Sequence, residues 1–137
     1  NLMSLCGLHR RLRGAIVGHL ALFEMTSSIP NRRYATGLRR LGLEAQVQPW
    51  RMTTIEAARR WDRGATIGVL HIDASHEYAD VRADFEHWSP FVVPGGYIVF
   101  DDVPSFPGPT RLLTELPRWY SYFAASPNQW WVRKNPA

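Results

Sequence analysis

Four residues that can bind a cation or exchange a proton follow two apolar segments of the chain. Asp73 and His76 come after the segment TIGVLHI, and Asp101 and Asp102 come directly after YIVF. Carboxylates that lie close together repel one another unless a cation lies between them, and oxygen ligands suit Mg²⁺. A nearby imidazole can accept a proton close to neutral pH. These residue types predict removal of a hydroxyl proton with the help of a divalent cation.

The two apolar segments, 66–72 and 97–100, have the composition of strands that are covered on both faces. Between them, the segment Glu77–Trp88 carries apolar residues at steps of three and four, which is typical of a helix. Ligands of open α/β sheets bind beyond the carboxyl ends of the strands. If the two strands are neighbours, the three acids and His76 should meet at one edge of the sheet.

Strands and helices alternate along the rest of the chain as well. The expected helices cover 2–12, 31–41, 53–61, 77–88 and 110–116, and the expected strands cover 15–23, 45–50, 66–72, 97–100, 119–124 and 129–133. We expect a turn at Pro94-Gly95-Gly96, a proline-rich loop over 104–109, and a hairpin through Ser126-Pro127-Asn128. This order predicts an α/β fold with a mostly parallel sheet, helices on both faces and a C-terminal antiparallel hairpin.

The composition indicates one globular domain over residues 1–137. The chain is 45% hydrophobic and 20% charged, and no apolar run reaches the length of a membrane span. Cys6 is the only cysteine, which excludes an internal disulfide and favours a cytoplasmic protein. The net charge of +4 comes from scattered arginine pairs, which are typical of solvated helix faces. We therefore expect neither a nucleic-acid partner nor a membrane partner.

Each residue of the acidic edge also has an ordinary structural interpretation. Asp73 or Ser75 could cap the following helix, His76 could lie on the surface of its first turn, and the two late acids could begin a polar loop. A phospho-acceptor domain of the receiver type would also contain paired acids. In that fold the acid pair follows an early strand, whereas here it comes late in the chain. Because acids follow both strands, a binding site is the favoured interpretation.

The middle of the chain resembles class I S-adenosylmethionine (SAM)-dependent methyltransferases, which have a Rossmann-like fold. The resemblance is greatest to the metal-dependent sugar O-methyltransferases of the methyltransferase domain 24 type. Their pattern "IDG-x-H-x-Y", "D-x-x-x-W", "L-x-P-G-G" and a strand ending in two acids is matched over about residues 31–103. The matching segments are IDASHEY (72–78), Asp84 with Trp88, VPGG (93–96) and the two acids at 101–102. Ala74 stands where the family usually has glycine.

The resemblance implies an O-methyltransferase that acts on a hydroxyl of a small molecule, such as a sugar or another natural product. It implies that Asp73, Asp101 and Asp102 bind a metal ion, with Mg²⁺ as the expected ion. His76 would be the general base for the acceptor hydroxyl. SAM is the implied cofactor, and Asp73 is also expected to contribute to its binding.

The front of the chain departs from the family pattern. No glycine-rich turn of the G-x-G kind occurs before residue 66, so a first strand and its turn are expected to precede Asn1. If 15–23 is the second strand, Glu24 is the acid expected to bind the cofactor ribose. The alternative is a non-catalytic remnant or interaction module. A homo-oligomer could cover the sheet edge that a missing strand would expose.

Aromatic residues are concentrated near the C-terminus, at positions 119, 120, 122, 130 and 131. They could line an acceptor pocket or an oligomer interface. Packing of the terminal hairpin is the simpler explanation and the one that we expect, because aromatic side chains dominate interior contacts.

Overall fold

The computed structural model describes residues 36, 39–40, 42, 50, 52–73 and 75–136. The expected helix over 2–12, the expected strand over 15–23 and Glu24 lie outside the described residues, as does nearly all of the expected strand over 45–50. Residues 36, 39 and 40 are helical, in agreement with the helix predicted over 31–41.

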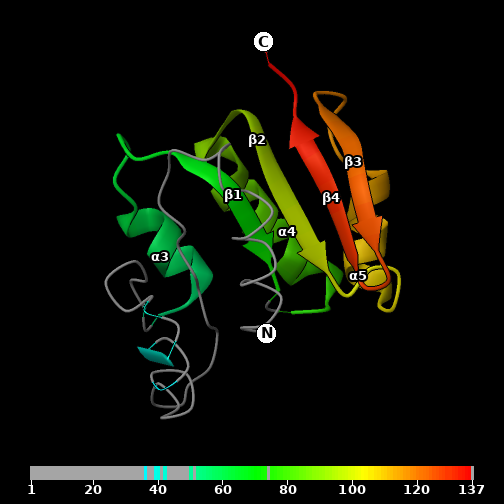
Figure 1. Ribbon diagram of the computed structural model, residues 1–137, viewed down its shortest axis with the longest axis horizontal. Helices are drawn as coiled ribbons and strands as arrows, with labels where there is room; N and C mark the ends of the chain where they lie inside the picture. The colour runs from blue at the N-terminus through cyan, green and yellow to red at the C-terminus, as the bar shows by residue number, and fades with distance from the viewer. Residues whose placement is uncertain are drawn as a thin grey trace.

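In the part of the chain that the structure describes, four strands form one mixed sheet in the order β1-β2-β4-β3 (Figure 1). Their bounds are Ile67–Ile72 for β1, Val92–Asp101 for β2, Tyr120–Ser126 for β3 and Gln129–Lys134 for β4. The β1–β2 pair is parallel, and the β2–β4 and β3–β4 pairs are antiparallel. The predicted parallel crossover and the C-terminal antiparallel hairpin are both confirmed.

The described helices are α3 (Thr54–Arg60), α4 (Tyr78–Trp88) and α5 (Pro107–Thr114), and the short 3-10 helix η2 (Ser89–Phe91) follows α4. In Figure 1, α4 and α5 lie behind the sheet and α3 lies beside β1. Buried residues of all three helices belong to one core cluster with one face of the sheet. None of these described helices is long and apolar enough to span a membrane.

The apolar stripe of α4 packs against the sheet as its spacing predicts. Val81 and Trp88 are each 1% exposed, and Phe85 is also buried. The neighbouring helix α3 begins with a capping box, in which the side chains of Thr53 and Glu56 bond each other's backbone N–H groups. The buried Thr54 hydroxyl donates to Asp84 of α4, and burial raises the pKa of that carboxyl. Helices α3 and α4 are thus joined by a hydrogen bond as well as by the apolar core that they share.

The expected turn at Pro94-Gly95-Gly96 is wrong, because these residues lie inside β2. The strand is irregular there: Ile67 pairs with Val92, whereas Val69 already pairs with Tyr97. Gly95 has φ +82°, a conformation that glycine adopts readily. The pattern that suggests a turn in the sequence therefore produces a bulged strand, since the extra residues are absorbed without reversing the chain.

The expected start of the helix over 110–116 is also wrong, because α5 already begins at Pro107. Pro107 and Pro109 lie in its first turn, where the backbone N–H groups have no partner within the helix, so proline is tolerated there. The predicted proline-rich loop is thereby shortened, and Gly108 in the same turn is brought against the backbone of His76.

The opposite face of the sheet carries a smaller cluster of Val69 and Val99, with Tyr97 and Trp131 packed against it. Among the described residues, helices pack on one face of the sheet only, whereas the sequence predicts helices on both faces. Side chains alternate along a strand, so His71, Asp73 and Asp101 follow Val69 and Val99 on this second face.

Candidate functional site

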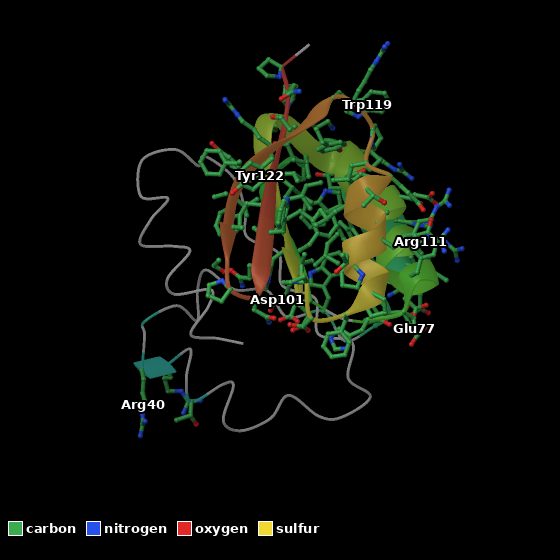
Figure 2. All side chains as sticks on the ribbon, turned by 90° about the vertical axis from the view of Figure 1, so that its right-hand side faces the viewer. Arg40, Glu77, Asp101, Arg111, Trp119 and Tyr122 are labelled. Carbon is green, nitrogen blue, oxygen red and sulfur yellow. The ribbon has the colours of Figure 1, made fainter. Side chains whose placement is uncertain are left out.

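The carboxyl ends of β1 and β2 meet at one edge of the sheet, as expected. Ile72 is paired with Phe100, so Asp73 and Asp101 are the next residues on two adjacent parallel strands. Figure 2 shows Asp101 and Glu77 at the same end of the molecule, with Trp119 at the opposite end. The start of α4 therefore lies at the edge where both strands end.

Asp73 and Asp101 form a cluster with His71, which lies two residues before Asp73 on β1. One ligand atom of each residue can be chosen so that all three lie within 4.8 Å of one another. Asp73 is exposed, whereas His71 and Asp101 are partly buried. Burial and the charge of Asp73 raise the pKa of Asp101, while His71 and a hydrogen bond from Gln129 act in the opposite direction. A cation between the carboxylates would relieve this repulsion.

His71 contributes an imidazole to the cluster, and burial favours the neutral form of that imidazole. Burial lowers the pKa of His71, and the two neighbouring carboxylates oppose that effect. The neutral imidazole is the form that binds metal ions, and carboxylate oxygens are also common ligands. The donor set of the cluster therefore fits a divalent cation.

Asp102 lies outside this cluster and contacts His76 instead. Its backbone has φ 59°, and its Oδ2 lies 2.5 Å from His76 Nε2. Asn128 Nδ2 donates to Asp102 Oδ1 over 2.7 Å, and this bond is the main reason that the pKa of Asp102 is lowered. The His76 ring stacks on Phe106 with centroids 3.8 Å apart and an interplanar angle of 10°. The imidazole is thus held on its edge by Asp102 and on its face by Phe106.

Asn128 connects the hairpin turn to the segment that carries Asp102. Besides its bond to Asp102, its Oδ1 accepts from Ser105 Oγ over 2.9 Å, and its backbone oxygen accepts from Val103 N over 3.3 Å. The β3–β4 turn therefore supports the orientation of Asp102, although it is 26 residues away in the sequence.

We predict that Asn128→Ala raises the pKa of Asp102 towards its ordinary value, because the variant removes the bond that lowers it most. A lowered folded-state pKa contributes stability above the unfolded pKa, and that stability is lost as pH falls through the folded value. As the pH falls below about 5, the unfolding free energy of the variant should therefore decrease less steeply than that of the original protein. Carboxyl ¹³C titration and urea unfolding measure the two effects.

The matched control is Asn135→Ala, which removes an Oδ1 acceptor of Ser121 at the other end of the hairpin. It should leave the titration of Asp102 unchanged. Equal shifts in the two variants would show that Asn128 affects Asp102 only through general loosening of the hairpin.

The predicted site residues therefore fall into two groups on the described structure. Asp73 and Asp101 lie together, and Asp102 lies with His76; the predicted roles of these residues in metal and cofactor binding and in catalysis stay predictions. His71, Phe106 and Asn128 were not singled out in the sequence. For His71 a signal was present, since residues two apart on a strand share a face, which places His71 with Asp73. The same alternation separates Asp101 from Asp102.

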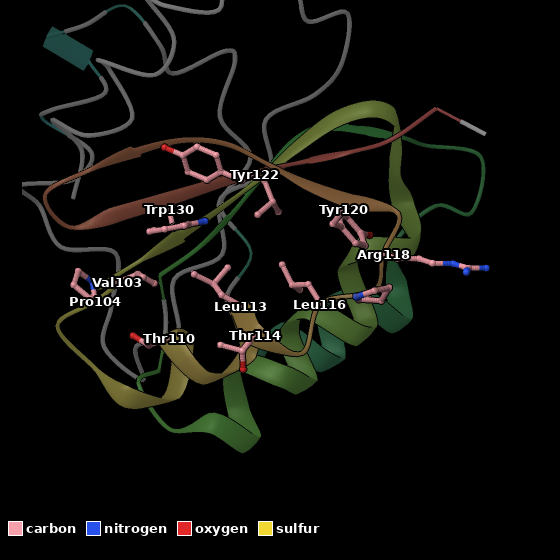
Figure 3. A pocket seen from close by; sticks show the side chains of 12 residues that line it. Val103, Pro104, Thr110, Leu113, Thr114, Leu116, Arg118, Tyr120, Tyr122 and Trp130 are labelled. Carbon is pink, nitrogen blue, oxygen red and sulfur yellow. The ribbon is translucent and has the colours of Figure 1, made fainter.

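An apolar pocket of about 420 Å³ lies between α5 and the β3–β4 hairpin (Figure 3). Tyr120, Tyr122 and Trp130 line it from the hairpin, and Val103 and Pro104, which follow Asp102, also belong to its lining. Trp131 packs on the other face of the sheet, and Trp119 is 55% exposed. The C-terminal aromatics thus divide between this pocket, the second face and solvent. The size of the pocket is in the range that holds small molecules.

Comparison with known proteins gives matches in sequence and in fold. The uncharacterised protein y4gI of Sinorhizobium fredii is 42% identical over 38 residues, which cover 28% of this chain and 4% of that protein. The O-methyltransferase TomG from Streptomyces achromogenes, solved in complex with SAM, matches with a TM-score of 0.67 and 15% identity, over 88% of this chain and 63% of TomG.

MycE methyltransferase from the mycinamycin biosynthetic pathway, solved with Mg, SAH and mycinamycin VI, matches with a TM-score of 0.58 and 19% identity. That match covers 87% of this chain and 37% of MycE. At such identities the structural matches show a shared fold, and this chain spans less than two thirds of each of these proteins. A family model described as a methyltransferase domain matches residues 2–103, three quarters of the chain. The chain belongs to this methyltransferase-domain family.

Proposed function

We propose that this chain is a SAM-dependent O-methyltransferase, or a fragment of one, and that it methylates a hydroxyl of a small molecule such as a sugar or another natural product with the help of a metal ion. The observation that carries the proposal is the edge of the sheet itself. Asp73 and Asp101 lie side by side there, and Asp102 holds the imidazole of His76 at the same edge. The SAM and Mg that the TomG and MycE structures contain support the proposal.

His76 is the proposed general base. If Nε2 donates its proton to Asp102, the ring is held in the tautomer in which Nδ1 is free of its proton. Nδ1 can then accept the acceptor's hydroxyl proton, and Asp102 stabilises the imidazolium that forms. Stacking on Phe106 restricts rotation of the ring, so the basic nitrogen keeps one direction.

The rest of the proposed reaction depends on a cation and on SAM. A cation held by Asp73 and Asp101 would supply positive charge that makes the acceptor hydroxyl more acidic. Bound SAM would supply an electrophilic sulfonium methyl to the acceptor oxygen whose proton His76 takes, so that the products would be a methyl ether and S-adenosylhomocysteine (SAH). The residues of the sheet edge act by positioning these groups.

The test combines cofactor binding with a matched pair of histidine variants. Calorimetry of the 137-residue chain should show binding of SAH, and methyl transfer from labelled SAM to a panel of sugar and phenol acceptors should be detectable in the presence of Mg²⁺. His76→Gln should lower the transfer rate by about 10²–10⁴-fold, the usual contribution of a general base. His87→Gln, on the exposed side of α4, should leave the rate unchanged.

Two outcomes would count against the proposal. A His76→Gln variant as active as the His87→Gln control would remove His76 from the chemistry. A chain that binds neither SAH nor a divalent cation would instead support the alternative function, a non-catalytic member of the family that keeps the fold as an interaction module.

A further inference from the structure

We propose that His71, Asp73 and Asp101 together bind a divalent transition-metal ion in preference to Mg²⁺. The inference rests on the proposed function in one respect, because both place the cation at the same edge of the sheet. It differs from the three-acid site expected from the sequence, because a nitrogen ligand replaces the carboxylate of Asp102.

The first observation is the position of His71 on the sheet. His71 and Asp73 are two residues apart on β1, so their side chains leave the same face. Asp101 leaves that face from β2, and the parallel register places it beside Asp73. One donor atom from each residue fits within a separation of 4.8 Å, which allows a single ion to contact all three.

The second observation is the state of the His71 ring. Its Nε2 is shielded from solvent and has no hydrogen-bond partner among the described residues. Nearly all buried polar atoms in folded proteins have a hydrogen-bond partner, so an atom without one calls for an explanation. One ring nitrogen of His71 lies in the cluster with the two carboxylates, and a metal ion bound among them would give the imidazole a partner.

The third observation is that Asp102 is engaged elsewhere. Both of its carboxylate oxygens are within hydrogen-bond distance of other side chains. Asp102 Oδ2 contacts His76 Nε2, and Asp102 Oδ1 accepts from Asn128 Nδ2. Recruiting Asp102 as a metal ligand would require it to give up at least one of these contacts. His71, by contrast, already lies within the cluster.

The donor set determines which ion is preferred. Mg²⁺ favours oxygen ligands at short distances in octahedral geometry, whereas imidazole suits transition-metal ions such as Fe²⁺, Ni²⁺ and Zn²⁺. One nitrogen and two carboxylates, with Asp73 exposed so that water can complete the coordination, suit a mixed nitrogen and oxygen site. Mn²⁺ is the informative probe, because its paramagnetism reports a coordinated ¹⁴N nucleus directly.

The experiment measures Mn²⁺ and Mg²⁺ affinity of the 137-residue chain by calorimetry and records electron spin-echo modulation of bound Mn²⁺. We expect Mn²⁺ to bind at least about tenfold more tightly than Mg²⁺, with a ¹⁴N coupling. His71→Gln, which offers an amide oxygen, should lose the coupling and the preference for Mn²⁺ while it keeps its Mg²⁺ affinity. Circular dichroism verifies that the variant is folded.

Two further variants separate the possible ligand sets. His87→Gln should keep the ¹⁴N coupling, which excludes a surface histidine as its source. Asp102→Asn should change Mn²⁺ affinity by less than about threefold, since Asp102 is not a ligand in this scheme. A large loss in Asp102→Asn, together with an unchanged His71→Gln variant, would overturn the inference in favour of the three-acid site.

The outcomes also distinguish this inference from the proposed function. Equal Mn²⁺ and Mg²⁺ affinities without a ¹⁴N coupling overturn the inference and leave a magnesium-assisted methyltransferase intact. A ¹⁴N coupling that depends on His71, in a chain that neither binds SAH nor transfers methyl groups, supports the metal site and contradicts the function. Binding of neither ion overturns the inference outright.

Discussion

Replacing Gly108 with alanine is expected to destabilise the protein by about 1–3 kcal/mol, the usual cost of overpacking an interior contact. A Cβ at this position would lie 2.0 Å from the backbone oxygen of His76 and 2.8 Å from the backbone nitrogen of Tyr78. Both obstacles are backbone atoms, so α5 and the start of α4 must move apart. Helix propensity alone would predict the opposite change in stability, because it favours alanine over glycine by about 1 kcal/mol.

The same substitution should disturb the candidate site, because the backbone that must move carries His76. Urea unfolding monitored by circular dichroism gives the free energy of unfolding, and the imidazole resonances of His76 report the change at the site. Gly64→Ala is the matched control: its Cβ would meet no atom closer than an Asp62 carboxylate oxygen at 3.5 Å. A Gly108→Ala variant as stable as this control would show that the two helices are not in such close contact.

Truncating Trp88 to alanine is expected to cost about 3–5 kcal/mol, the largest effect that we predict for a single side chain. Trp88 is 1% exposed, and its ring makes edge contacts with Trp61 at 5.5 Å and with Phe91 at 6.1 Å between centroids. Its removal leaves a cavity where α4 meets α3 and the sheet. A cost of this size is a large fraction of the stability of a small domain.

Trp119→Ala provides the control for Trp88→Ala, because it removes the same atoms from a side chain that is 55% exposed. Its unfolding free energy should stay within about 0.5 kcal/mol of the original protein, as is usual for surface substitutions. Urea unfolding followed by far-ultraviolet circular dichroism avoids the loss of tryptophan fluorescence in both variants. Similar costs for the two variants would contradict the packing of Trp88 described above.

Local sequence patterns predicted the elements whose burial repeats with a regular period. The stripe of α4 is recognisable because the buried face of a helix requires apolar residues at steps of three and four. The run of β1 is recognisable because a buried strand is mostly apolar. Pro94-Gly95-Gly96 and the prolines of α5 misled the prediction. Glycine and proline restrict the backbone of single residues, and a bulged strand or a first helical turn tolerates them as well as a turn does.

Acids follow two strand-like segments of the sequence and a histidine follows the first acid, which is enough to predict the edge of the sheet where the site lies. Strand alternation already separates Asp101 from Asp102, but the partners that each of them meets depend on the tertiary structure. The positive φ of Asp102 and its bond to Asn128 direct that carboxylate to His76, while strand register leaves Asp101 with Asp73 and His71. Register and long-range hydrogen bonds join residues far apart in the chain, so no local pattern encodes them.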